Sequence, residues 1–368
     1  MTKPTYLILQ TLPEGNNALV HLAYNEVLDK QVVQKTISML GLADAVAHAE
    51  PRLLDRLEHK HLVQVSDAQW DPDNVAIAGV TFIMPYYEGG SVQGNLMKGY
   101  NFSVGEAVRI AAQVLDALDY LHTEKRILHR DLKVSNVFLS TDKKTAYLGD
   151  LGSAAEMDQN GKTEARSGTA LYRPPECSDG HYGVPGEIYG VGMMLLEMLN
   201  GRYPYEDIDA SQVLKRNTEG TRSLPKKYFE PGVHVPGPLC RLIRQMVNIN
   251  PSMRPKSAAA AKRSLQGIPH LNWRLSDSGE HEFDHVWTGE KRNEKTGKLR
   301  FYEVRARKPE NAPPRIGQFE VSARWRNGES EVWRGMPALG IRSTETGSQE
   351  WRKIFKSVSD LAHRWAAK

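Results

Sequence analysis

The sequence predicts an α+β protein in three parts: a small antiparallel sheet with one helix, a larger and mainly helical lobe, and a small α+β domain at the C-terminal end. Short strand-like runs dominate the first 84 residues, whereas apolar side chains recur at helical spacing from about residue 103. The composition changes near Pro269, because residues 269–368 hold six of the seven tryptophans and 19 basic against 14 acidic side chains.

The first part contains short runs rich in Leu, Val and Tyr, separated by Gly, Asn or charged residues. Such runs over 5–10, 18–24 and 31–37 predict the strands of an antiparallel meander. Helical spacing predicts a helix over 44–58, and apolar runs around 62–65 and 76–84 return to strand character. We therefore expect five strands and one helix.

The second part begins with an apolar stripe that predicts a long helix, with Ser103 as its N-cap. The stripe consists of Val108, Ala111, Ala112, Leu115, Leu118 and Leu121. We expect residues 1–84 and 85–268 to form two lobes, and residues 269–368 to form an accessory domain. A strand-rich lobe followed by a helical one favours ligand binding in the cleft between them.

The overall composition is that of a folded protein, with 40% hydrophobic and 25% charged residues in 368. The two cysteines, Cys177 and Cys240, suit a reduced compartment better than a disulfide framework, so we expect the cytoplasm. The N-terminus lacks the pattern of a signal peptide. The most apolar later segment, 191–199, is too short to span a bilayer and contains Glu197, which favours a buried helix and no membrane anchor.

Two short motifs carry most of the information about chemistry. Residues 129–136 read HRDLKVSN, and residues 149–152 read GDLG. Their order and spacing resemble those of the eukaryotic-like, or Hanks-type, protein kinase superfamily. The resemblance covers residues 1–268. It implies the bilobal protein kinase fold and transfer of the γ-phosphoryl group of ATP to protein hydroxyl groups.

The resemblance gives each polar residue of these motifs a role. Asp131 orients the substrate hydroxyl or accepts its proton, and Lys133 steadies the transferring phosphate. Asn136 and Asp150 bind the Mg²⁺ ions that neutralise phosphate charge. Leu151 stands where the family has phenylalanine, a change that keeps the neighbouring carboxylate intact.

Lys35 and Glu50 match the family's lysine and helix glutamate, a pair that aims the ammonium group at the α- and β-phosphates. Taken alone, a lysine in a strand more often lies on a solvated face. Pro51 follows Glu50 directly and disfavours helical geometry there, unless the helix begins at that point.

Residues 13–20 are the counterpart of the loop that covers the phosphates in this family. Only its middle glycine, Gly15, is retained, because Pro13 and Ala18 replace the flanking glycines. These changes should stiffen the loop and limit the approach of backbone amides to phosphate. We therefore expect a modest affinity for ATP.

Residues 82–91 resemble the hinge between the lobes, with Met84 as the gatekeeper and Tyr87 where a backbone N–H meets adenine. The apolar clamp around adenine would consist of Leu12, Val20, Val33 and Phe138. Each of these residues alone is more readily interpreted as part of a core. Only their shared register favours contact with the nucleotide.

Residues 168–176, GTALYRPPE, resemble the end of the activation segment in serine/threonine kinases. In this family Glu176 would pair with Arg254 as a buried ion pair. Glu187 stands where the family usually has an aspartate that braces the catalytic loop, so its carboxylate lies one methylene further out. Positioning supplies much of the catalysis, and this change weakens the expectation of full activity.

Arg130, directly before the catalytic aspartate, favours regulation by phosphorylation of the activation segment, including autophosphorylation. Thr163 and Ser167 are the candidate sites. The alternative is that both are ordinary polar loop residues.

The accessory domain shows alternating strand-like segments at 301–307 and 319–325, and Asn327-Gly328 predicts a hairpin turn into 331–333. Residues 349–366 place apolar side chains on one helical face, which consists of Trp351, Ile354, Phe355, Val358, Leu361, Ala362 and Trp365. The region resembles no family.

Its arginines and tryptophans allow several interpretations: nucleic-acid binding, docking of a substrate or an acidic partner, or a small core with a solvated basic face. The modest excess of positive charge and the lack of a recognition motif favour the structural or protein-docking interpretation.

Two other functions compete with an active protein kinase. A pseudokinase would use the same fold as a scaffold, but every charged residue that catalysis needs is present. A small-molecule kinase is disfavoured by the PPE-type activation segment, which ordinarily receives a peptide.

Overall fold

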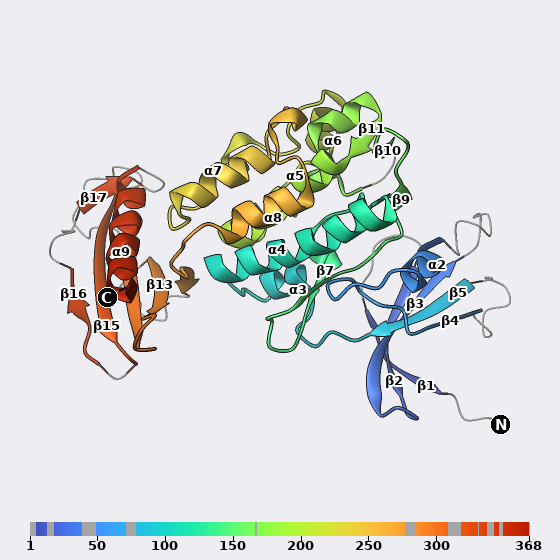
Figure 1. The fold of residues 1–368 in the computed structure, drawn as a ribbon, viewed down its shortest axis with the longest axis horizontal. Coiled ribbons are helices and arrows are strands. Elements are labelled where there is room, and N and C mark those ends of the chain that lie inside the picture. Colours follow the sequence, from blue (N-terminus) through green and yellow to red (C-terminus); the bar gives the residue numbers. More distant parts are fainter. Residues whose placement is uncertain are drawn as a thin grey trace.

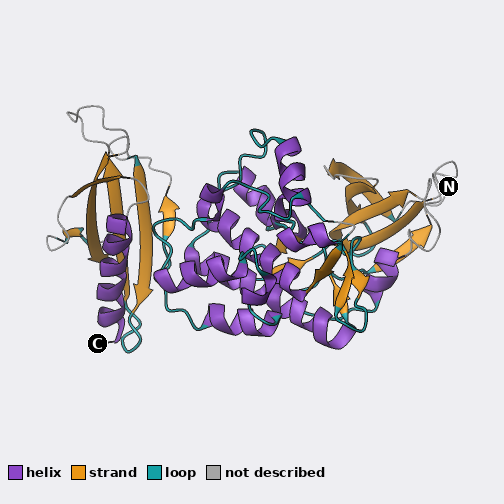
Figure 2. Ribbon diagram, turned by 90° about the horizontal axis from the view of Figure 1, so that it is seen from above, coloured by secondary structure: helices purple, strands orange, loops and turns teal. Residues whose placement is uncertain are grey.

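The computed structural model describes residues 5–12, 18–38, 49–70, 79–165, 168–276, 284–307, 318–329, 331–336, 342–345 and 349–367. They form three parts in a row, with a strand-rich lobe at the N-terminal end, a helical lobe in the middle and a second sheet with a long helix at the far end (Figure 1). The view from above again places the helical lobe between the two sheets (Figure 2). The expected bilobal fold followed by a further β-rich region is confirmed.

The N-terminal lobe is built on an antiparallel sheet in the strand order β1-β2-β3-β5-β4. Its elements are β1 (Tyr6–Leu12), β2 (Ala18–Asn25), β3 (Lys30–Ser38), α2 (Ala49–Asp55), β4 (Asp67–Trp70) and β5 (Gly79–Pro85). The opening meander is as predicted, and α2 follows it in the chain.

The prediction of a strand around 62–65 is wrong, because the strand in this region, β4, begins at Asp67. Leu62 and Val63 are buried, but against the helical lobe. Leu62 forms a bridge with Leu148, and the backbone N–H of Val63 donates to the Leu148 carbonyl at 2.9 Å. Contact between the lobes, and not a strand of the first sheet, explains this apolar run.

The helical lobe contains α3 (Val92–Met97), α4 (Val104–Tyr120), α5 (Val184–Asn200), α6 (Ala210–Thr218), α7 (Gly237–Met246) and α8 (Ala258–Gln266). Its short strands are β6 (Ile127–Leu128), β7 (Val137–Leu139), β8 (Ala146–Leu148), β9 (Ala155–Glu156), β10 (Lys162–Glu164) and β11 (His181–Gly183). Ser103 caps α4 as predicted, because its hydroxyl accepts from the N–H of Glu106 while the Glu106 carboxylate accepts from the N–H of Ser103.

The apolar core has its centre in α5, whose side chains from Ile188 to Leu199 are buried. The segment 191–199 is therefore the buried helix that its apolar run predicted. No helix among the described residues is long and apolar enough to cross a membrane. Cys177 and Cys240 are buried free thiols.

The accessory domain is an antiparallel sheet in the order β12-β13-β14-β15-β16, with β17 also pairing with β15. Its elements are β12 (Arg274–Ser276), β13 (His285–Arg292), β14 (Leu299–Arg307), β15 (Gln318–Asn327), β16 (Arg334–Gly335), β17 (Arg342–Glu345) and α9 (Gln349–Ala367). The predicted strands and helix are present. Two details differ: the strand after the Asn327-Gly328 turn is β16, beyond 331–333, and Leu361 is 40% exposed.

The accessory domain is bound tightly to the helical lobe through the segment before β12. Trp273 is fully buried, and its carbonyl accepts from the N–H of Val104 at 2.8 Å. The side-chain oxygen of Asn272 accepts from the N–H of Gly105 at 2.9 Å. These two bonds satisfy free amides at the start of α4, so the accessory domain helps to cap a helix of the other lobe.

A second contact lies at α9. The Arg352 guanidinium donates to the carbonyls of Pro231 and Gly232 at 2.6 and 3.2 Å, and to the Cys240 sulfur at 3.2 Å. The buried side chains of Trp273 and Phe355 pack edge to face at 5.1 Å. One apolar core therefore runs from the helical lobe into the accessory domain.

We expect Trp273→Ala to lower the free energy of unfolding of the whole chain by about 3–5 kcal/mol, because it leaves a cavity in the shared core. Trp333→Ala is the matched control, since this half-buried ring stacks on Arg324 and Arg326 and its loss should cost about 1 kcal/mol. Urea unfolding measures both. An equal decrease in the free energy of unfolding in the two variants would contradict a core shared between the helical lobe and the accessory domain.

Candidate active site

Lys35 of β3 is the centre of the candidate site. Its ammonium group lies 3.1 Å from the Glu50 carboxylate of α2 and 3.0 Å from the Asp150 carboxylate. Lys35 is only 6% exposed and Glu50 only 4%. Pro51 does not prevent this contact, because Glu50 lies in α2 and still reaches the lysine. Both lobes therefore contribute to one buried charge cluster.

Asp150 follows β8 and has a left-handed backbone conformation, with φ of +59°. Burial alone would raise its pKa, but the charge and hydrogen bond of Lys35 hold the pKa below the usual value. Gly152 lies close to both carboxylates, since a Cβ atom there would stand 3.1 Å from a Glu50 oxygen and 3.5 Å from an Asp150 oxygen. A larger residue at this position would crowd the cluster.

The catalytic loop places Asp131, Lys133 and Asn136 together. The Lys133 ammonium group lies 2.7 Å from one Asp131 carboxylate oxygen. The Asn136 amide donates to the Asp131 carbonyl at 2.9 Å. The N–H of Gly149 donates to the Asn136 carbonyl at 2.9 Å, which ties this loop to the segment that carries Asp150.

Glu187 of α5 supports the catalytic loop through hydrogen bonds to its backbone. Its carboxylate accepts from the backbone N–H groups of His129 and Arg130 at 3.0 and 2.9 Å, so the extra methylene does not prevent it from bracing the loop. The Tyr182 hydroxyl donates to it at 2.9 Å, and His122 lies 3.3 Å away. Burial would raise the pKa of Glu187, but these hydrogen bonds and the nearby imidazoles lower it.

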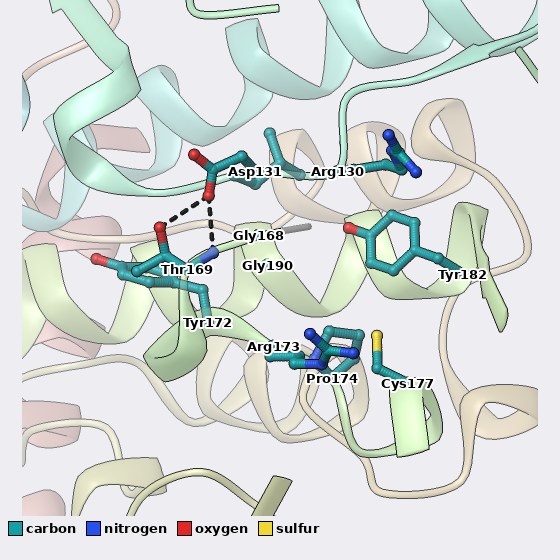
Figure 3. A pocket seen from close by; sticks show the side chains of 11 residues that line it. Arg130, Asp131, Gly168, Thr169, Tyr172, Arg173, Pro174, Cys177, Tyr182 and Gly190 are labelled. Atoms are coloured by element: carbon teal, nitrogen blue, oxygen red, sulfur yellow. Dashed lines mark hydrogen bonds between the residues drawn. The ribbon is translucent and has the colours of Figure 1, made fainter. Parts of the chain in front are cut away.

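The activation segment is attached to the catalytic aspartate. Figure 3 shows Thr169 facing Asp131, and one Asp131 oxygen accepts from both the hydroxyl and the N–H of Thr169 at 2.8 Å. Gly168 has φ of +110°, and a Cβ there would stand 2.7 Å from the Arg130 carbonyl, so glycine is required. Beyond it, Glu176 pairs with Arg254 through two bonds of 2.6 and 2.7 Å, as expected.

The residues assigned to adenine come from the N-terminal sheet, from the segment after β5 and from β7. In the sheet, Val33 pairs with Met84 and Leu12 pairs with Val20. Across the hinge, the Tyr87 and Phe138 rings stack with centroids 5.8 Å apart. Val20 is buried, whereas Leu12, Val33, Met84, Tyr87 and Phe138 are half-buried. Gly15 lies outside the described residues.

Sequence reasoning missed three contacts of this site. His122 and Tyr182 support Glu187, and the His129 ring lies 2.9 Å from the Gly149 carbonyl. His129 could have been found from its place directly before Arg130 and Asp131. No pattern in the sequence connects Tyr182 or His122 with Glu187, because the contact depends on how the chain folds back.

Comparison with known proteins agrees with this geometry. A family model of the protein kinase domain matches residues 6–265. The chain belongs to the protein kinase family. No family model matches the accessory domain of this kinase.

Three curated relatives resemble the kinase. The probable serine/threonine-protein kinase WNK8 of Oryza sativa subsp. japonica is 32% identical over 60% of this chain and 36% of its own length. Serine/threonine-protein kinase Nek4 of Mus musculus is 28% identical over 75% of this chain and 34% of its own. Serine/threonine-protein kinase Nek3 of Oryza sativa subsp. japonica is 29% identical over 72% of this chain and 44% of its own. The kinase thus spans less than half of each relative.

Protein kinases use ATP and Mg²⁺, and the residues of this cleft fit both. Asn136 and Asp150 offer an amide oxygen and a carboxylate, the hard oxygen ligands that Mg²⁺ prefers. Their segments are joined by the bond between Gly149 and Asn136, and Lys35 lies beside Asp150 as a cation for phosphate oxygens.

We expect Glu187→Ala to lower the free energy of unfolding of this kinase by about 3–5 kcal/mol, because the His129 and Arg130 amides lose their buried acceptor. Glu187→Asp keeps a carboxylate and should lose less. Chemical denaturation of the two variants beside the unchanged protein measures the difference. An alanine variant as stable as the unchanged protein would show that Glu187 does not brace the loop.

Proposed function

We propose that the chain is a serine/threonine protein kinase that transfers the γ-phosphoryl group of ATP to Ser or Thr hydroxyl groups of proteins. The observation that carries the proposal is the contact of Lys35 with both Glu50 and Asp150, which assembles the phosphate side of the cleft. The names of the three relatives, all serine/threonine kinases, support the acceptor class.

In the proposed reaction the acceptor oxygen bonds to the γ-phosphorus, the bond from that phosphorus to the β–γ bridging oxygen breaks, and ADP leaves. Lys35 binds the α- and β-phosphates. Asp131 orients the acceptor hydroxyl and takes its proton, and Lys133 places positive charge beside the transferring group. Asn136 and Asp150 would hold Mg²⁺, which when bound neutralises phosphate charge.

The chain's own bonds prepare this geometry before substrate binds. Thr169 and Lys133 each bond to a different Asp131 oxygen, and this fixes the orientation of the carboxylate. The buried Glu187 fixes the backbone beneath it. Such pre-organisation is the main way in which a protein accelerates phosphoryl transfer.

We expect Asp131→Ala to lower the rate of phosphoryl transfer by about 10²–10⁴-fold, because the acceptor hydroxyl loses its base. Transfer of radiolabelled phosphate from ATP to a panel of proteins, peptides and small alcohols measures the rate. Asp119→Ala, on the half-buried polar side of α4, is the control and should retain activity. Equal incorporation by Asp131→Ala and the unchanged protein would end the enzyme hypothesis and favour a pseudokinase.

Regulation by phosphorylation of the activation segment is a further part of the proposal. The Arg130 guanidinium donates to the carbonyls of Ser153 and Glu164 at 2.5 and 2.9 Å, and Arg173 donates to the Ala165 carbonyl at 2.7 Å. Two cations thus lie beside the segment of Thr163, where a phosphate would add charged acceptors. Ser167, the other candidate, lies outside the described residues.

We expect mass spectrometry of the active protein to find phosphate on Thr163 or Ser167, and to find none in the Asp131→Ala protein if the modification is autocatalytic. Thr163→Ala should lower activity by about tenfold if Thr163 is the site, because the segment loses its added charge-assisted bonds. Thr218→Ala on α6 is the control. An active protein with both Thr163 and Ser167 unmodified would contradict the proposal.

The accessory domain is proposed to dock protein substrates. Its bonds to Val104, Gly105 and Pro231 fix it at the end of the helical lobe away from the N-terminal sheet (Figure 1). A domain held in one place can present a substrate at a constant position relative to the cleft. Deleting residues 269–368 would also remove Trp273 and expose the part of the helical lobe's core that it covers, so surface substitutions test this role better than truncation.

A further inference from the structure

A basic groove lies between the start of α7 and the exposed side of α9, where the accessory domain meets the helical lobe. The cavity has a volume of about 930 Å³. Its cations are Arg241, Arg352, Lys353, Lys356 and Arg364. Arg352 joins the two walls through its bond to the Cys240 sulfur. Both the helical lobe and the accessory domain therefore contribute to the groove.

The charge of the groove is largely uncompensated. Asp360 is the single carboxylate among the described residues of its lining, and it pairs with Lys356 at 3.4 Å. Both of these side chains are mostly exposed, so this salt bridge is weak and neutralises little of the positive charge of the groove. Among the described residues, Arg241, Lys353 and Arg364 form no salt bridge, and all three are exposed. Five cations against one carboxylate attract an acidic partner.

One further feature of the groove favours an anion. Helix α7 begins without a side-chain cap, because Pro236 stands at the N-cap, and its first residues Gly237 and Pro238 line the groove. The positive end of the helix dipole therefore lies beside the groove.

The lining also indicates the class of ligand. Proline and aliphatic side chains, including Val233, Pro236 and Pro238, lie among the cations and suit an extended peptide that carries apolar residues beside its carboxylates. Single-stranded nucleic acid is typically bound on exposed rings on which bases stack. Among its described residues the lining contains no tryptophan or tyrosine, and its one phenylalanine, Phe355, is buried.

We propose that this basic groove binds an acidic segment of a protein substrate. The inference rests on the proposed kinase function and names the surface that performs the docking. A segment held there raises the local concentration of an acceptor residue elsewhere in the same substrate. The groove thereby selects substrates independently of the residues around the cleft.

The test compares two matched triple variants of the full chain. Arg241→Glu, Lys353→Glu and Arg364→Glu reverse three groove cations that form no salt bridge with any residue in the described part of the chain. The control variant reverses three exposed cations outside the groove, Lys226→Glu, Lys295→Glu and Lys298→Glu, with the same change in net charge.

Fluorescence anisotropy measures binding of a labelled peptide rich in Asp and Glu, with single-stranded DNA of equal charge as a second probe. We expect the groove variant to bind the peptide at least about tenfold more weakly than the unchanged protein, and the control variant to bind it normally. No binding of the peptide, equal weakening in both variants, or binding of DNA in its place would overturn the proposal.

Measuring the rate of peptide phosphorylation distinguishes a failure of the groove proposal from a failure of the proposed kinase function. The acidic peptide is fused to a generic acceptor peptide, and kcat/KM is measured with and without the acidic tail. We expect the tail to lower KM about tenfold for the unchanged protein and to have no effect for the groove variant, with kcat on the untailed peptide unchanged. If neither peptide is phosphorylated, the kinase function fails, and the binding measurement still decides whether the groove takes acidic segments.

Discussion

The buried ammonium group of Lys35 is the contact on which the two lobes of this kinase depend. It lies between the carboxylates of Glu50 and Asp150, one from each lobe, and it is nearly inaccessible to water. A buried charge that loses its partners costs several kcal/mol, so β3, α2 and the segment after β8 must stay in register. The pairing of Lys35 with Glu50 and Asp150 that holds the two lobes together also places the Lys35 ammonium group where it could bind the phosphates of ATP.

Glu187 has a comparable role one layer deeper. Its carboxylate bonds to the amides of His129 and Arg130, and Tyr182 connects it to the strand that pairs with the activation segment. The catalytic loop is therefore held from below by α5, while Thr169 and Lys133 hold Asp131 from the side. The accessory domain adds a third level of support, because Trp273 and Asn272 complete the start of α4.

The sequence predicted the charged residues of the site because phosphoryl transfer requires particular side chains in a fixed order, and Lys35, Asp131 and Asp150 retain that order. It could not predict which surfaces meet. The run at Leu62 packs against the helical lobe, and Tyr182 reaches Glu187, only because distant segments fold together. The contact between the accessory domain and the helical lobe at Trp273, and the basic groove, likewise form only because distant segments fold together. The altered loop around Gly15 lies outside the described residues, so the expected modest affinity for ATP stays a prediction.

A crystal structure of the full chain with Mg²⁺ and a non-hydrolysable ATP analogue would show directly whether Lys35 binds phosphate. We expect nucleotide between the lobes, Lys35 bonded to its phosphates while still paired with Glu50, and metal ions on Asn136 and Asp150. A structure in which the analogue is bound without contact to Lys35, or in which Asp150 holds no metal ion, would contradict this expectation.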